Sequence, residues 1–219
     1  MTPSPLFSSF RQALSEAWAS GAGILLPMGF FTGTAMLVPF TLGDEAETLA
    51  KIGPGVLWLA LALAALVTLE RVFQADLQDG ALDLWAQEET SISLIALTKT
   101  VAHWLISGAP LILMAPVLGR LLGVPFEDMV PAMLAYGLGG LTFFLWGGVA
   151  AALSAGVARA GLLIALIAIP FFVPAIIFGT LSLSEGFDGS AILFLGASTL
   201  FALGVAPAAM GAALRLAAE

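Results

Sequence analysis

Six long stretches without a charged side chain divide this sequence, and they limit its fold more than any other feature. The uncharged runs are 17–43, 52–69, 100–119, 129–158, 160–184 and 189–214. A hydrocarbon core about 30 Å thick is crossed by roughly 20 apolar residues in a helix, so each run is long enough, or nearly so, to cross a membrane once. The runs therefore predict an all-α, polytopic membrane protein with six transmembrane helices.

Charge and cysteine content exclude several other classes of protein. Only 10% of the residues are charged and the formal net charge is −8, whereas soluble domains carry about 25% charged residues. This excludes a soluble enzyme and, in the absence of a basic patch, a nucleic-acid binder. The strands of an outer-membrane barrel would be short and alternating rather than continuously apolar. The chain has no cysteine, which excludes disulfides, thiolate metal sites and iron–sulfur clusters.

We expect a single transmembrane domain over residues 1–219, because the connections between the runs are too short to hold a second folded domain. Its spans are expected near 21–43, 53–70, 100–120, 129–155, 160–182 and 190–214. Residues 5–20 are predicted to form an interfacial helix, since apolar and polar side chains fall on opposite faces with a 3.6-residue period. The apolar face comprises Leu6, Phe7, Phe10, Ala13, Leu14, Ala17 and Trp18. An extension of the first span is the alternative.

Basic residues predict the orientation of the spans. Six spans divide the flanking segments into two sets, one holding both termini and the connections 70–99 and 156–160. That set contains five of the seven basic residues, namely Arg11, Arg71, Lys99, Arg159 and Arg215. The other set contains only Lys51 and Arg120. Because cytoplasmic flanks carry the excess of lysine and arginine, both termini are expected in the cytoplasm.

Two prolines in the fifth run predict an interruption of that span. Pro170 and Pro174 lack backbone N–H groups and disfavour helix in the residue before each. Gly179 and Gly186 follow them. We therefore expect a broken fifth span that ends in short or re-entrant segments, with a kinked but continuous helix as the alternative.

The connection from Glu70 to Lys99 is the longest on the side with both termini, and it is acidic overall. A segment needed only for connection could be far shorter. Residues 74–85 can form short helical turns that present apolar and acidic side chains to another protein. Leu77, Leu82 and Trp85 are the apolar candidates, and Asp76, Asp79 and Asp83 are the acidic ones. A solvated acidic loop is the alternative.

Groups able to do chemistry inside the membrane are sparse. The middles of all six runs lack charge, which argues against an ion-coupled carrier. His103 is the only histidine and lies near the start of the third span, where both a structural and a functional role remain open.

No phosphate-cradling Gly-x-x-x-x-Gly-Lys-[Ser/Thr] motif occurs, so ATP binding would require a partner. Six spans and a sizeable connection after the second fit half of an ABC exporter's membrane domain. A secondary carrier for a small solute and a non-transporting scaffold are the alternatives.

Three stretches of sequence carry a closer resemblance. They are residues 69–82 (LERVFQADLQDGAL), Lys99 followed by 102–104 (AHW) and 108–111 (GAPL), and residues 52–58 (IGPGVLW). In these motifs the chain resembles the CcmB family, the haem exporter permeases of bacterial cytochrome c maturation. It departs from the family pattern at 87–93, where this chain has no proline and members often carry prolines soon after the Asp-Gly motif.

The resemblance implies a homodimeric permease of the type-2 ABC class in the bacterial inner membrane, bound to two copies of the ATPase CcmA. It also implies cooperation with the haem-handling protein CcmC, the small membrane protein CcmD and the haem chaperone CcmE. ATP hydrolysis on the partner would promote haem delivery or release of the haem-loaded chaperone. The chain by itself would not be an enzyme.

The family carries a coupling helix between spans two and three, and its residues transfer to this sequence. The positions expected to couple to the ATPase are Gln74, Asp76, Gln78, Asp79, Gly80, Leu82 and Asp83. Further family-motif positions at or in the membrane are Glu70, Arg71, His103, Trp104 and Pro110. No catalytic or metal-binding residue is expected, with ATP held by the partner ATPase and haem by partner proteins.

The scarcity of haem ligands predicts a mechanical role. Haem iron takes axial ligands such as His, Met, Cys or Tyr, and this chain offers one histidine, one tyrosine (Tyr136) and seven scattered methionines. Its five tryptophans lie on separate segments. We therefore expect the chain to transmit mechanical work to a haem-handling partner rather than to provide the main haem-binding site.

Overall fold

The structure is a computed structural model that describes residues 10–15, 18, 22–43, 45–81, 85, 91–124, 129–157, 159–184 and 189–217. Every regular element in these ranges is a helix. The elements in chain order are α2 (Ala22–Leu42), α3 (Ala46–Leu69), α4 (Arg71–Gln78), α6 (Ile92–His103), η1 (Trp104–Gly108), α7 (Ala109–Leu121), α8 (Met129–Leu153), α9 (Gly161–Ser184) and α10 (Ser190–Ala217).

Among the described residues, six helical segments are long and apolar enough to cross a membrane, as the charge-free runs predict. They are Ile24–Leu42, Ala46–Gln74, Ile92–Leu121, Val130–Leu153, Gly161–Ser184 and Ser190–Ala217. The third segment starts earlier than the uncharged run that predicts it, because Lys99 lies inside the helix and is buried there. The chain is therefore a multi-pass, all-α membrane protein.

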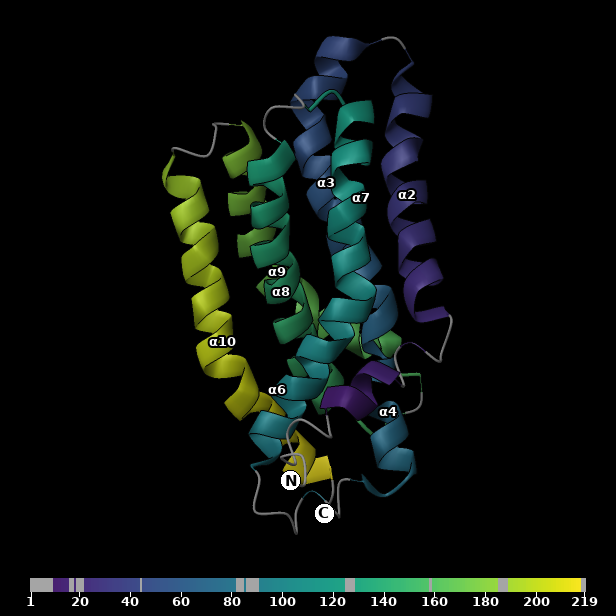
Figure 1. The fold of residues 1–219 in the computed structure, drawn as a ribbon, viewed down its shortest axis with the longest axis vertical. Helices are drawn as coiled ribbons and strands as arrows, with labels where there is room; N and C mark the ends of the chain where they lie inside the picture. The colour runs from purple at the N-terminus through teal and green to yellow at the C-terminus, as the bar shows by residue number, and fades with distance from the viewer. Residues whose placement is uncertain are drawn as a thin grey trace.

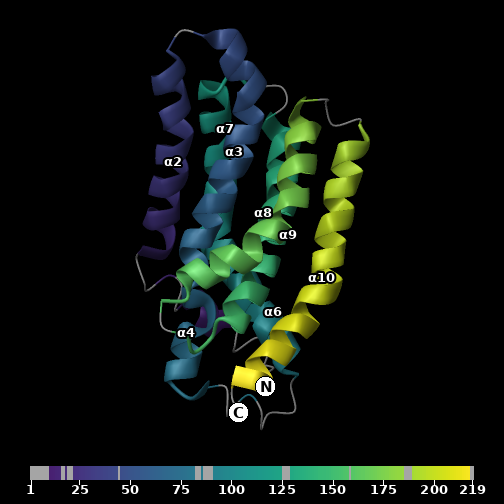
Figure 2. The same cartoon turned by 180° about the vertical axis from the view of Figure 1, so that it is seen from behind.

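The helices form a bundle whose two ends differ (Figure 1). Helix α4, the described helical residues 10–15 and the last turns of α10 gather at one end. The C-terminal ends of α2, α7 and α9 and the N-terminal ends of α3, α8 and α10 lie at the other end, and Figure 2 shows the same division from behind. The two sets of flanking segments distinguished by their basic residues thus lie at opposite ends of the bundle.

Helix α8 is the most buried of the six spans and forms the centre of the bundle. It packs against α3, α7, α9 and α10, and its side chains Tyr136, Phe143 and Phe144 are fully buried. Membrane helices pack closely where small residues let their backbones approach one another, and α8 contains five glycines. Close packing around α8 therefore rests on glycine positions rather than on a single repeated motif.

The fifth span is continuous, so the predicted break after Pro170 is wrong. Helix α9 runs from Gly161 to Ser184 with Pro170 and Pro174 inside it, and Figure 2 shows a bend along its length. A proline removes one backbone hydrogen bond, whereas a break would leave several polar groups without partners in hydrocarbon. Gly179 lies within the helix and packs against Trp58, while Gly186 falls outside the described residues.

The third span changes helix type in its middle. Helix α6 passes into the five-residue π-helical segment η1, and α7 continues after it with Pro110 in its first turn. The proline ring would clash with the carbonyl of Ile106 in a regular α-helix, and the wider turn of η1 avoids this contact. The span is therefore composed of two α-helices that meet at an irregular joint.

Of the predicted interfacial helix over 5–20, the structure describes 10–15 and Trp18, all of them helical. Ala13 is buried, whereas Arg11, Gln12 and Ser15 are exposed. Of the predicted apolar face, Ala13 is thus buried, whereas Trp18 is 67% exposed.

Candidate functional site around helix α4

Helix α4 begins after Glu70, which forms a turn at the end of α3, and it has one buried and one exposed face. Val72, Phe73 and Asp76 are buried. Gln74 and Asp79 are exposed. The helix ends at Gln78, and Gly80 in the turn that follows has a φ of +70°, a value that favours glycine. This short amphipathic helix lies between the second and third spans, where the sequence predicts a coupling helix.

Asp76 faces into the bundle. Its carboxylate accepts a hydrogen bond from Lys99 Nζ on α6, and the two residues are 7% and 8% exposed. This corrects the expectation that Asp76 offers its charge to a partner, because its spacing from Val72 and Phe73 places it on the apolar face of α4. A charge buried in that position requires an opposite charge beside it.

Trp85 also contacts this ion pair. Lys99 Nζ lies 5.4 Å from the centroid of the Trp85 ring, within the range of a cation–π interaction. Trp85 is half-buried and packs against the hydrophobic core, so it is not a freely exposed docking residue. The contact joins α4, Trp85 and α6, which are separated along the chain.

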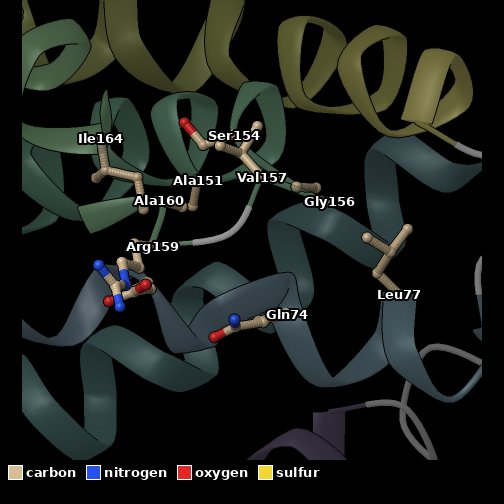
Figure 3. Close-up of a pocket in the computed structure, with 11 residues that line it drawn as sticks. Gln74, Leu77, Ala151, Ser154, Gly156, Val157, Arg159, Ala160 and Ile164 are labelled. Carbon is tan, nitrogen blue, oxygen red and sulfur yellow. The ribbon is translucent and has the colours of Figure 1, made fainter. Parts of the chain in front are cut away.

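A cleft of about 430 Å³ lies between α4 and the connection from α8 to α9. Figure 3 shows Gln74 and Leu77 on α4, across from Ala151 of α8 and Arg159 of the connection. Leu77 approaches the far side at Gly156, where its Cδ2 lies 3.3 Å from the position that a Cβ on that glycine would occupy. Leu77 is therefore half-buried against this protein rather than open to a partner.

Glu70 links the start of α4 to the start of α9. Its Oε2 lies 3.3 Å from the position of a Cβ on Gly161, the first residue of α9. A carboxylate near a helix N-terminus interacts favourably with the helix dipole. The family-motif position Glu70 therefore lies where the second span, α4 and the fifth span meet, while its neighbour Arg71 is exposed.

The other family-motif positions lie inside the third span, away from the exposed face of α4. His103 ends α6 and its ring is 5.7 Å from that of Phe144. Trp104 begins η1 and Pro110 lies in the first turn of α7. His103 Nε2 and Trp104 Nε1 are buried and make no hydrogen bond in the described structure. The described residues contain no group of three His, Cys, Asp or Glu that could hold a metal ion.

The structure divides the predicted coupling residues into separate groups. Gln74, Asp79 and Gly80 are exposed at the end of the bundle, whereas Asp76 is buried. Gln78 ends α4, and Leu82 and Asp83 lie outside the described residues. Sequence reasoning missed Lys99 as the partner of Asp76. The spacing of Val72, Phe73 and Asp76 could have indicated it, since a buried acid calls for a nearby base at the start of the next span.

These features define a multi-pass membrane protein with an amphipathic helix between its second and third spans. The family model described as "CcmB protein" matches residues 5–217. The chain is 40% identical over 210 residues to "Heme exporter protein B" of Paracoccus denitrificans, with 93% of this chain and 95% of the relative covered. It is 36% identical to the Pseudomonas aeruginosa protein of that name, with 87% of each covered. Identity to the Escherichia coli K12 protein is 33%, over 94% of this chain and 96% of the relative. The chain belongs to the CcmB family.

Proposed function

We propose that this chain is the membrane subunit of an ABC transporter that serves haem export in cytochrome c maturation. Support comes from its family and from relatives named heme exporter protein B. The observation that carries the mechanism is the position of α4, an amphipathic helix at one end of the bundle with Gln74 and Asp79 exposed. Such a helix offers a docking surface to a soluble partner while its buried face stays attached to the spans.

The partner in this proposal is the ATPase CcmA, with two copies on a homodimer of this chain. The sequence has no phosphate-cradling loop, so ATP binds to the partner. Asp79 lies beside Gly80 in the turn that follows α4, and Asp83 comes four residues later in the sequence. Their negative charges orient a complementary surface of the ATPase and steer its association.

The α4 end lies in the cytoplasm of a bacterial inner-membrane protein under this proposal. Arg71, Lys99, Arg159 and Arg215 belong to that end of the bundle, and Lys51 and Arg120 belong to the other. Positive charge is retained on the cytoplasmic side during insertion. An ATPase supplied with cytoplasmic ATP therefore meets α4 directly.

The chain acts as a transducer in this scheme rather than as the main haem site. Trp58, a side chain able to contact a porphyrin, is enclosed by Gly139 of α8 and Gly179 of α9 and serves helix packing. ATP hydrolysis on CcmA moves α4, and the spans pass this movement to the haem-handling protein CcmC with the small protein CcmD. The outcome is delivery of haem or release of the loaded chaperone CcmE.

Charge reversal at Asp79 and Asp83 tests the docking assignment. The variant with Asp79→Lys and Asp83→Lys should copurify less CcmA and lose the ATP turnover of the complex, because complementary charges become repulsive. A control with Glu45→Gln and Glu47→Gln removes two exposed acids at the opposite end without adding positive charge there. Unchanged copurification and turnover in the reversed variant would count against docking at α4.

The same purified complex can distinguish a transducer from a passive scaffold. Inactivating ATP hydrolysis in CcmA while preserving its binding should stop c-type cytochrome maturation if the chain transduces work. Continued maturation with an inactive ATPase would instead identify the chain as a scaffold.

A further inference from the structure

Helix α4 is attached unequally to the spans around it. On one side a buried ion pair joins it to α6, and on the other a cleft separates it from the connection between α8 and α9. We infer that the Asp76–Lys99 pair makes α4 and α6 move as one body, and that η1 is the joint at which this body turns relative to α7. The inference rests on the proposed docking of an ATPase at α4, and it identifies Asp76 and Lys99 as positioning residues.

Burial makes this ion pair resist separation. Asp76 and Lys99 are 7% and 8% exposed, so pulling α4 away from α6 would separate opposite charges in a poorly solvated environment. Trp85 adds a ring contact to the same ammonium group at 5.4 Å. A displacement of α4 is therefore transmitted to α6 before the pair breaks.

The opposite side of α4 packs against α8 and is bordered by a cleft. The contact of Leu77 with Gly156 is a van der Waals contact, and the adjoining cleft of about 430 Å³ leaves space beside α4. Figure 3 shows that space between Gln74 and the residues of α8. Movement of α4 on this side changes the width of the cleft without breaking the buried pair, so the pair still couples α4 to the third span.

The third span contains the joint that this movement requires. Segment η1 interrupts the α-helix between Lys99 and α7, and Figure 1 shows the direction of the span changing there. A π-helical turn within an α-helix is frequent at functional positions. Trp104 Nε1 and Ser107 Oγ make no hydrogen bond in the described structure, so neither side chain fixes η1 to α8 by a polar contact.

Spin labels on either side of η1 test the movement. Leu94 on α6 and Leu113 on α7 are 46% and 68% exposed, and the chain has no native cysteine that would compete for label. The double variant Leu94→Cys with Leu113→Cys is assembled with its ATPase and diluted with unlabelled chain. The distance distribution between the labels should differ between the nucleotide-free and the ATP-trapped complex. An unchanged distribution would overturn the assignment of η1 as the joint.

Paired substitutions test transmission through the ion pair. Asp76→Asn or Lys99→Met should abolish the nucleotide-dependent change while CcmA still copurifies, and cytochrome maturation per ATP hydrolysed should fall about tenfold. Lys99→Arg keeps the charge and should retain the movement. Lys51→Met, an exposed lysine in α3 at the opposite end, is the matched control and should leave it unchanged.

The outcomes distinguish this inference from the proposed function. Normal label movement and maturation in both Asp76→Asn and Lys99→Met would overturn transmission through the pair while leaving docking intact. Loss of CcmA binding in these variants would also overturn it, because the pair would then serve docking itself. The exchanged pair, Asp76→Lys with Lys99→Asp, should restore the label movement if that variant assembles. If it does not assemble, the comparison of Lys99→Arg with Lys99→Met decides whether the pair transmits the movement.

Discussion

The indole of Trp58 lies between two glycines that belong to different spans. A Cβ on Gly139 of α8 would come within 2.2 Å of the Trp58 ring, and one on Gly179 of α9 within 2.3 Å. Trp58 also packs against Tyr136, with ring centroids 4.9 Å apart. Because a tryptophan ring is rigid, even one added methyl group at either glycine must move a helix. The approach of α3, α8 and α9 thus depends on single residues.

Gly139→Ala should lower the stability of the folded chain by about 1–3 kcal/mol, because the new methyl group overlaps the Trp58 ring. Gly137→Ala is the matched control, since nothing lies within 4 Å of a Cβ at that position of the same helix. Thermal unfolding of the two purified variants in detergent measures the difference. Equal unfolding temperatures would contradict the close packing of Trp58.

Residue types alone could not show which acid near α4 is buried in the bundle and which is exposed to a partner. Asp76 and Asp79 are three positions apart, and the sequence predicts both to face a partner. The structure buries Asp76 beside Lys99 and exposes Asp79. Residues three positions apart share a helical face, so the difference follows from where the helix ends: α4 stops at Gln78, and Asp79 lies in the turn beyond it. The role of both acids in coupling stays a prediction.

At the scale of elements, charge-free runs predict the spans well but not their interruptions. A membrane excludes unsatisfied backbone groups, so a long apolar run has to be helical whatever prolines it contains. This is why α9 continues through Pro170 and Pro174. The π-helical segment η1 escaped prediction because its cause, the ring of Pro110 against a carbonyl one turn earlier, acts on backbone geometry rather than on hydrophobic pattern.

Pro110→Ala should allow η1 to relax toward a regular α-helix, because alanine restores a backbone donor and removes the ring. The variant is expected to unfold at the same or a higher temperature, since alanine is favoured over proline by about 3 kcal/mol in a helix interior. Cytochrome maturation should nevertheless fall if η1 acts as a joint. Pro116→Ala, in α7 of the same span, is the control and should preserve maturation. Full maturation by Pro110→Ala would contradict a need for the irregular segment.

At the scale of the whole molecule, the two ends of the bundle differ in charge and in structure. The end with α4 carries most of the basic residues and the buried ion pair, whereas the other end carries short connections and the exposed acids Glu45 and Glu47. The number of spans and this division into two ends follow from the spacing of charges along the sequence. Contacts between distant segments form only in the packed bundle, so the local sequence does not predict them. The approach of Glu70 to the start of α9 is an example.

The orientation of the bundle is open to direct measurement, because the chain contains no cysteine and each introduced thiol is unique. Ser91 precedes α6 at the α4 end and Glu45 precedes α3 at the other, and both are exposed. Positive charge retained in the cytoplasm predicts that a membrane-impermeant maleimide labels Glu45→Cys in intact cells. Ser91→Cys should react only after the inner membrane is opened, and the unmodified chain gives the background. Labelling of Ser91→Cys from outside, with Glu45→Cys protected, would reverse the topology and place α4 out of reach of any cytoplasmic ATPase.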